Sequence, residues 1–392
     1  MSALFGPRMF QSFLALGRTA ERGGWSVTAP DGRTFAHAGA EPGATAVLRI
    51  NDWGVLPAIS RRGDLGFAET YRDGRWTTDD LVAVIRFACD NEAALRRVLS
   101  GSWVQRAVSN LAYALRANTR RGSRRNIHAH YDLGSDFFSL WLDPSMTYSS
   151  ALFAHDDQPL EAAQHNKHDA VLARLGSRPG DVLDIGCGWG SFIERALDRA
   201  GHRVTGVTIS PAQWTYARSR LAGKEEQAAV HLRDYRDLDG RFDSIVSVEM
   251  FEAVGERYWP TYFAKIAALL RRGGRAVIQT ITVKDADFPR YRRGIDVFRS
   301  FIFPGGMLAS PSRIAALAAD AELKMTDGLS FGPDYAKTAT HWLSAFDTAR
   351  DRIAGLGFDD KFIALWRFYL ATCVAAFAAR KIDVMHIELR HA

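Results

Sequence analysis

Residues 181–190 read Asp-Val-Leu-Asp-Ile-Gly-Cys-Gly-Trp-Gly, and this stretch decides the fold. Its apolar run, Val182 to Ile185, predicts a buried parallel strand, and a helical pattern begins directly after the last glycine. Three glycines stand at alternate positions between strand and helix: Gly186, Gly188 and Gly190. Without side chains there, backbone N–H groups can approach a ligand. The stretch therefore predicts the first strand–turn–helix unit of a nucleotide-binding α/β domain.

The spacing of these glycines separates the possible ligands. It is Gly-x-Gly-x-Gly, not the Gly-x-Gly-x-x-Gly of dinucleotide-binding turns. Asp184 precedes the turn directly, where its carboxylate would repel a pyrophosphate but suits an amino acid-like or sulfonium group. The pattern favours S-adenosylmethionine over other nucleotides.

Length and composition limit the class of protein to which this chain can belong. A chain of 392 residues has room for two domains, and 47% apolar with 24% charged residues is typical of globular proteins. The three cysteines, Cys89, Cys187 and Cys373, are far apart, which argues against a disulfide framework or zinc site and favours a reducing compartment. The longest apolar run, Phe368 to Ala379, is shorter than the roughly 20 residues of a membrane span. We expect a soluble or peripheral protein.

The positive charge is concentrated in one run. The net charge is +6, and residues 116–125 hold five arginines and no acid: Arg116, Arg120, Arg121, Arg124 and Arg125. Such a cluster suits anionic lipid headgroups or nucleic acid. A solvated interdomain linker over 116–127 is the alternative interpretation.

Before this run, residues 1–115 predict a small α+β domain without a catalytic constellation. The expected helices are 9–20, 51–62 and 81–99, and the expected strands are 25–27, 34–36 and 46–50, with an aromatic-rich loop over 66–76. After the run, His128 and His130 lack a third ligand at metal-site spacing, so no metal is expected.

Strands and helices alternate from residue 164 onward, with strands expected over 182–185, 203–207, 230–232, 242–248 and 275–282. Ligands of parallel sheets bind beyond the carboxyl ends of the strands. That rule brings five segments to one rim: 186–190, 208–213, 234–235, 249–252 and 279–281. Glu252 is the acid we expect to act there, because it closely follows a buried strand.

Residues 283–310 interrupt the alternation with interleaved basic and aromatic side chains. Such a segment can stack on single-stranded nucleic acid or line an acyl pocket behind a headgroup site. The two later aromatic helices, 342–353 and 360–379, are expected to cover the sheet.

Taken together, several motifs resemble the cyclopropane-fatty-acyl-phospholipid synthase family. They are His130-Tyr-Asp-Leu-Gly, Met146-Thr-Tyr-Ser, the glycine turn, Gly206-Val-Thr-Ile-Ser-Pro-Ala-Gln213, Asp234-Tyr-Arg-Asp-Leu, Ser247-Val-Glu-Met-Phe-Glu252, Phe303-Pro-Gly-Gly and Phe331-Gly-Pro-Asp-Tyr335. The resemblance covers about 125–385. It implies a Rossmann-like, seven-stranded class I methyltransferase sheet over 128–392, with an aromatic-rich acyl-pocket insertion at about 283–345. Residues 1–115 resemble the family's smaller lipid-binding domain.

The resemblance also implies the site. The cofactor, S-adenosylmethionine, would be bound by Tyr148, Ser149, Asp184, Gly186, Gly188, Gly190, Thr208, Ser210, Gln213, Asp234, Tyr235 and Val248. The family holds a bicarbonate as its base with a Cys, a Glu, a His, a Tyr and a backbone group beside an Ile. Those positions hold Ser150, Glu252, Gln279, Tyr335 and Ile281 here, so Ser and Gln replace the Cys and the His. Both can hydrogen-bond an anion, but the site loses an imidazole.

The implied substrate is a phospholipid with an unsaturated acyl chain. Attack of its double bond on the sulfonium methyl group leaves a cation, which the aromatic faces of Tyr148, Phe153 and Tyr335 can stabilise. Because of the two replacements, we favour a methylated or methylenated product over a cyclopropane. The alternatives are a true cyclopropane synthase, a nucleic-acid or small-molecule methyltransferase, and a non-catalytic lipid-binding protein. We further expect a homodimer, located in the cytoplasm at the inner face of the membrane, and no nucleic-acid partner.

Overall fold

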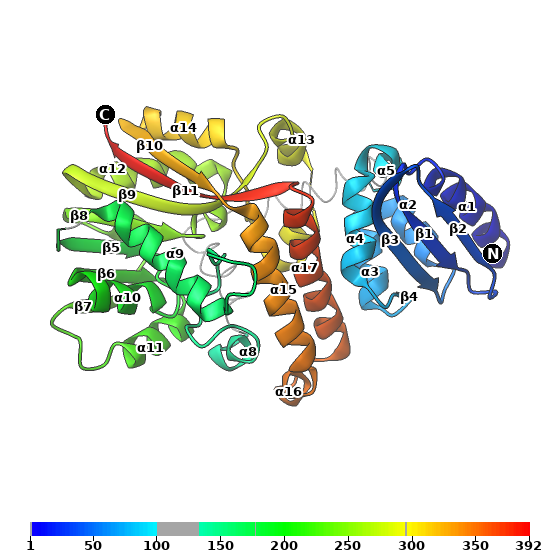
Figure 1. The fold of residues 1–392 in the computed structure, drawn as a ribbon, viewed down its shortest axis with the longest axis horizontal. Helices are drawn as coiled ribbons and strands as arrows, with labels where there is room; N and C mark the ends of the chain where they lie inside the picture. Colours follow the sequence, from blue (N-terminus) through cyan, green and yellow to red (C-terminus); the bar gives the residue numbers. More distant parts are fainter. Residues whose placement is uncertain (1, 100–132, 177, 295) are drawn as a thin grey trace. The chain divides into compact units, whose positions relative to one another are not determined.

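The computed structural model describes residues 2–99, 133–176, 178–294 and 296–392 (Figure 1). The arginine run, His128 and His130 lie outside the described residues. The chain folds into two compact units. One comprises residues 1–113, 293–302 and 342–381, and the other comprises 114–292, 303–341 and 382–392. We call them the N-terminal unit and the sheet unit.

The sheet unit contains seven strands in the order β10-β11-β9-β8-β5-β6-β7 (Figure 1). Their bounds are β5 Asp181–Ile185, β6 Arg203–Thr208, β7 Ala228–Leu232, β8 Phe242–Val248, β9 Leu270–Val283, β10 Leu323–Ser330 and β11 Ile382–His391. The pairs among β5 to β9 are parallel, whereas β11 runs antiparallel to both β9 and β10. The seven-stranded sheet predicted from the sequence is confirmed.

Helices cover both faces of this sheet. They are α8 Ser135–Ser139, α9 Leu160–Leu175, α10 Ser191–Ala200, α11 Pro211–Arg220, α12 Trp259–Leu269, α13 Phe288–Arg293 and α14 Pro311–Asp320. One apolar core gathers Trp259, Phe263 and Ile314 against the strands, and a second gathers Val171 and Ile193. Coverage on both sides explains why successive residues of the central strands β5 and β8 are buried, where a sheet with one solvated face would show alternating burial.

All five strands expected between residues 182 and 282 are present. The last of them, β9, begins at Leu270 and therefore includes Gly273 and Gly274, which precede the expected start at residue 275. The pairing of β9 with β8 shifts between Phe242 and Ser244, so the two glycines lie in a bulge rather than between elements. A Cβ on Gly274 would approach the carbonyl oxygen of Asp243 to 2.5 Å, so only glycine fits this close pairing.

The N-terminal unit is built on a four-stranded sheet in the order β2-β1-β3-β4. Its elements are α1 Ser2–Gly17, β1 Arg22–Thr28, β2 Thr34–Ala38, β3 Glu41–Ile50, α2 Val55–Arg62, α3 Asp64–Arg72, β4 Trp76–Thr77, α4 Leu81–Asp90 and α5 Glu92–Leu99. A π-helical turn, Phe298–Ile302, and the helices α16 Arg350–Gly355 and α17 Asp360–Ala378 complete it, and α15 Gly332–Thr348 passes from one unit into the other.

Residues distant in sequence therefore share the core of the N-terminal unit. Phe368 and Ala371 of α17 belong to the same buried cluster as Trp25 and Trp76. The expected division follows the chain, with one domain at 1–115 and the other at 128–392. The compact unit, in contrast, also includes 293–302 and 342–381. The aromatic helix expected to cover the large sheet, α17, packs instead in this core.

The loop expected over 66–76 is wrong, because its first half belongs to helix α3. Leu65 and Ala68 bury the apolar face of α3. A Cβ on Gly66 would lie 2.2 Å from the carbonyl oxygen of Ala58 in α2. The glycine therefore permits two helices to approach closely and is not a turn signal.

The single helix expected over 81–99 is interrupted at Asn91. This buried side chain accepts hydrogen bonds from the backbone N–H groups of Glu21 and Arg22 and donates to the carbonyl oxygen of Arg22. Asn91 thus ends α4 and fastens it to the start of β1.

Within the described part of the chain, one helix is long and apolar enough by composition to cross a membrane, namely the 19-residue α17. It extends the apolar run expected at 368–379 toward the N-terminus. Of the apolar window, 61% is buried inside the structure, as in the core helix of a globular protein. The composition of α17 is therefore weak evidence for a span.

Candidate active site

The glycine turn after β5 has the geometry that its sequence predicts. Gly186, Gly188 and Gly190 have φ angles of 86°, 53° and 87°, in the left-handed region that favours glycine. At Gly186 an added Cβ would also lie 2.7 Å from the Met250 side chain. The backbone conformation and the packing therefore both require glycine at position 186, so the backbone itself faces the site at this position.

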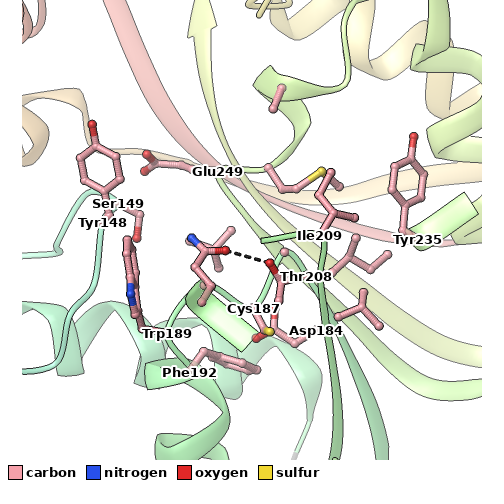
Figure 2. A pocket seen from close by; sticks show the side chains of 18 of the residues that line it. Tyr148, Ser149, Asp184, Cys187, Trp189, Phe192, Thr208, Ile209, Tyr235 and Glu249 are labelled. Carbon is pink, nitrogen blue, oxygen red and sulfur yellow. Dashed lines mark hydrogen bonds between the residues drawn. The ribbon is translucent and has the colours of Figure 1, made fainter. Parts of the chain in front are cut away.

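A cavity opens over this turn at the carboxyl ends of the parallel strands (Figure 2). Ten of the twelve expected cofactor-binding residues line it, namely Tyr148, Ser149, Asp184, Gly186, Gly188, Thr208, Gln213, Asp234, Tyr235 and Val248. Residues without an expected role also line it, among them Trp189, Ile209, Arg236 and Met250. The sheet topology thus brings four strand ends to one cavity, as the rim argument predicts.

The other two expected cofactor residues do not line the cavity but shape helices beside it. Gly190 precedes α10 in a left-handed conformation. Ser210 caps α11, with its Oγ accepting from the Gln213 backbone N–H at 3.3 Å. These two residues therefore shape the starts of the helices: Gly190 through its left-handed backbone, and Ser210 through its side-chain cap.

Two polar features of the cavity fit an amino acid-like, positively charged ligand. Asp184 is 2% exposed, and burial raises the pKa of its carboxyl to about 7, against the opposing charge of Lys167. A cationic group in the cavity would stabilise the ionised form of this carboxylate. On the adjacent strand β6, the Thr208 hydroxyl donates to Gln213 Oε1 at 2.8 Å (Figure 2).

Arg236 is a site residue that the sequence reasoning missed. Its Nε donates to Oδ1 of Asp234 at 2.9 Å and one Nη to Oδ2 at 2.6 Å, a bidentate pair at the end of β7. Such pairs fix both side chains in orientation. The Asp-x-Arg spacing at 234–236 is the sequence signal from which this pair could have been predicted.

A second polar cluster centres on Glu249, the residue directly after β8. Its Oε1 accepts from the backbone N–H of Ser150 at 2.8 Å and from Nε2 of Gln279 at 2.7 Å. Its Oε2 accepts from the Tyr335 hydroxyl at 2.7 Å. We call these four residues the Glu249 cluster. Glu249 also lines the cofactor cavity, on the side of Tyr148 and Ser149 (Figure 2).

Neighbouring groups fix the orientation and charge of this cluster. His386 of β11 bonds through Nε2 to Gln279 Oε1 at 2.8 Å, and burial lowers its pKa to about 3, so the imidazole is neutral. Gln279 must then turn its amide nitrogen toward Glu249 and the carbonyl oxygen of Ser150. Lys167, fully buried, donates to Ser149 Oγ at 2.6 Å, and burial lowers its pKa to about 8.

Glu252 has different partners from Glu249. Its Oε1 accepts from the Thr280 hydroxyl at 2.8 Å and from the backbone N–H of Ile281. Its Oε2 is buried and, among the residues described, has no hydrogen-bond partner. Burial and the nearby charge of Glu249 raise the pKa of Glu252 to about 8. Of the residues expected to hold one anion together with Glu252, only Ile281 bonds to it, whereas Ser150, Gln279 and Tyr335 bond to Glu249.

The described residues contain no group of three or more His, Cys, Asp or Glu side chains placed to hold a metal ion.

Residues 118–387 match the family described as mycolic acid cyclopropane synthetase. The chain belongs to this family. It is 37% identical over 357 residues to the tuberculostearic acid methyltransferase UfaA1 of Mycobacterium tuberculosis, covering 88% of this chain and 83% of that relative. It is 35% identical to the cyclopropane-fatty-acyl-phospholipid synthase of Escherichia coli strain K12, covering 88% and 87%.

A solved structure is similar as well. The mycolic acid cyclopropane synthase CmaA1 complexed with SAH and CTAB superposes with a TM-score of 0.64 at 32% identity, over 68% of this chain and 97% of that chain. The chain is thus an S-adenosylmethionine-dependent methyltransferase with the expected class I sheet. The prediction of family, enzyme class and cofactor from the motifs at 130–335 is confirmed.

Proposed function

We propose that this methyltransferase transfers the methyl group of S-adenosylmethionine to the double bond of an unsaturated fatty acyl chain in a phospholipid. The observation that carries the proposal is a carboxylate held by three donors in the wall of the cofactor cavity. Alkylating a double bond leaves a cation that must lose a proton, so the reaction needs a base beside the methyl donor. Oxygen- and nitrogen-methylating enzymes start from nucleophiles that carry lone pairs and do not create such a cation.

The names of the relatives support the acyl substrate. One is a tuberculostearic acid methyltransferase, another a cyclopropane-fatty-acyl-phospholipid synthase, and a third, 36% identical over 278 residues, a probable fatty acid methyltransferase of Pseudomonas putida. We extend the shared feature, a fatty acyl chain, to this protein.

The residues around the cavity have complementary tasks in this reaction. Tyr148 lines the cavity with its ring packed against Phe138 and Trp141, at centroid distances of 5.4 Å each, so its face is rigidly placed to stabilise a cation. Bound S-adenosylmethionine supplies the electrophilic methyl group. Phe153 is a weaker candidate for the same task, because the Lys337 ammonium already lies 5.5 Å from its ring centroid.

The proposed product is a methylated or methylenated acyl chain, with a cyclopropane as the alternative. Three outcomes are open to the cation. Loss of a proton from the chain gives a methylated alkene, and loss of a proton from the new methyl group closes the ring. If a hydride first shifts from the methylated carbon to the cationic carbon, loss of a proton from the methyl group gives the methylenated chain instead.

Mass spectrometry of lipids from cells that express the protein and receive methyl-deuterated methionine tests the proposal. An acyl chain that gains one methyl carbon, retains three deuteriums and keeps one unsaturation means methyl transfer with a proton lost from the chain. Two retained deuteriums with one unsaturation mean a methylenated chain, and two retained deuteriums without a double bond mean ring closure. The absence of any labelled lipid would refute the acyl substrate.

We further propose that the enzyme acts as a cytoplasmic homodimer at the inner face of the membrane, bound through the arginines of 116–125. Neutral replacements of all five should weaken binding to anionic vesicles, most strongly at low salt, where surface charges are least screened. Vesicle sedimentation measures this. Unchanged binding would assign the run to the linker instead.

A further inference from the structure

We propose that Glu249 is the general base of this reaction and takes the place of the bound bicarbonate that the family resemblance implies. The inference rests on the proposed acyl alkylation and names the group that removes the proton. It differs from the expectation that Glu252, with Ser150, Gln279 and Tyr335, holds a separate anion.

The donors expected to bind an anion are already bound to one. The backbone N–H of Ser150, the amide of Gln279 and the hydroxyl of Tyr335 all point to the carboxylate of Glu249, at 2.7 to 2.8 Å. A carboxylate and a bicarbonate present the same pair of acceptor oxygens on one carbon. A bicarbonate in this position would lose these donors and would face a second negative charge. The residues present therefore do not fit a separate bicarbonate.

The backbone indicates that this placement is built into the fold. Glu249 has a φ of 48°, which is uncommon for a residue other than glycine and carries strain. Its N–H donates to the carbonyl oxygen of Gln279 at 2.8 Å, so strand pairing holds the strained residue in register with its own side-chain partner. This backbone conformation places the Glu249 side chain in the lining of the cavity, at the end of β8.

The charges around the cluster favour an ionised Glu249 and a neutral Glu252. Glu249 has three donors and the Lys167 ammonium to stabilise its charge, although burial raises its pKa above the ordinary value. Glu252 has donors on one oxygen only, and the charge of Glu249 raises its pKa further. When two buried carboxylates lie close together, the one with more hydrogen-bond donors keeps its negative charge and the other is protonated.

The replacement of His by Gln at position 279 fits this role. A cationic imidazole beside Glu249 would lower the pKa of the carboxylate and weaken it as a base. The amide of Gln279 instead donates a hydrogen bond without adding charge. His386 behind it is neutral and keeps that amide in place.

The step balances with the groups present. The alkene carbon bonds to the methyl carbon while the sulfur–carbon bond breaks and its electron pair remains on sulfur. Glu249 then accepts a proton from the acyl cation. The freed C–H electron pair forms either the new double bond or the third ring bond. The proton leaves Glu249 for water when the product departs.

The first experiment measures methyl transfer to unsaturated phospholipid vesicles by the purified full-length protein in carbonate-free buffer, with and without added bicarbonate. Wild type should be active without bicarbonate and should change less than about twofold on its addition. A large stimulation by bicarbonate would overturn the inference but leave the acyl alkylation intact. No product under either condition would overturn both.

The second experiment uses Glu249→Gly, which removes the carboxylate and relieves the positive φ. This variant should lose turnover by about a hundredfold or more, the usual weight of a general base, and regain at least about tenfold with added bicarbonate or formate. Glu256→Gln, at a surface carboxylate paired with Arg292, is the matched control and should behave as wild type. A Glu249→Gly variant as active as wild type, or one that binds S-adenosylmethionine normally yet shows no rescue by either anion, would count against Glu249 as the base.

Discussion

Glu249 and Glu252 are separated by two residues at the end of the same strand, yet their surroundings differ. Both oxygens of Glu249 accept hydrogen bonds, from groups on three separate segments of the chain, and the side chain reaches the cofactor cavity. Glu252 accepts both of its bonds on one oxygen from the neighbouring strand β9 and buries the other. The first arrangement stabilises a charge beside the substrate, and the second stabilises a neutral acid. Sequence position alone does not distinguish a base from its neighbour.

The largest effect is expected from comparing Glu249→Gln with Glu252→Gln. An amide cannot accept the proton, so Glu249→Gln should lower kcat by about 10²- to 10⁴-fold, whereas an amide imitates a neutral carboxylic acid and Glu252→Gln should lose about tenfold or less. Methyl-transfer kinetics at saturating cofactor measure both.

Isothermal titration with S-adenosylmethionine is the control for this pair, and both variants should bind it within a few-fold of wild type. Turnover that collapses in Glu252→Gln but survives in Glu249→Gln would reverse the assignment of the two glutamates.

A smaller effect is expected from removing one hydroxyl from each glutamate, with Tyr335→Phe and Thr280→Val. The hydrogen bond from Tyr335 lowers the pKa of Glu249, so its loss should move the acidic limb of the pH–kcat profile to higher pH. Lys167, whose charge also lowers this pKa, and the nearby Glu252 are unchanged in both variants. Thr280→Val should leave this limb in place. Equal shifts in the two variants would mean that the glutamates titrate as one group.

The smallest effect concerns stability. The pKa of Glu252 is raised from 4.5 to about 8 in the folded chain, so the stabilisation from its protonated form is complete below about 4.5 and is lost as the pH rises through 8. The amide in Glu252→Gln cannot ionise, so the stability of this variant lacks the decrease that ionisation of Glu252 causes. Its melting temperature relative to wild type should therefore rise as the pH increases from 5 to 8, which thermal denaturation at a series of pH values measures. A constant difference across this range would show that Glu252 ionises freely.

The part of the fold predictable from sequence is the part determined by local pattern. Strands β5 to β8 follow from short runs rich in apolar and β-branched residues. The glycine turn follows from three glycines at alternate positions, which adopt the positive φ angles that glycine favours. Helix α3 lies within the segment expected as an aromatic-rich loop, because Gly66 is constrained by its close approach to the backbone of Ala58, a contact with no local sequence signal. The membership of α17 in the N-terminal core depends on contacts across nearly 300 residues, such as Arg367 with the Tyr71 hydroxyl at 3.0 Å.

The site follows the same division. The cofactor residues were largely predictable because most of them lie at or near the end of a strand with a recognisable pattern, whereas Tyr148 and Ser149 follow from the family motif at 146–149. Ten of the twelve line the cavity. The proposed role of Glu249 was not predictable from the sequence, although the segment 249–252 was expected at the rim. It depends on a left-handed backbone angle and on a hydroxyl 86 residues away, neither of which leaves a local signal.

The placement of His386 on β11 has a consequence for folding. This strand lies between β9 and β10 in the sheet but follows both in the chain, after the polypeptide has passed through residues 342–381 of the other unit. The imidazole that orients the Gln279 amide stands 107 residues after it in the sequence. The amide is therefore held toward Glu249 only once β11 has paired with β9, so assembly of the Glu249 cluster depends on a non-local strand pairing, which forms slowly compared with local contacts.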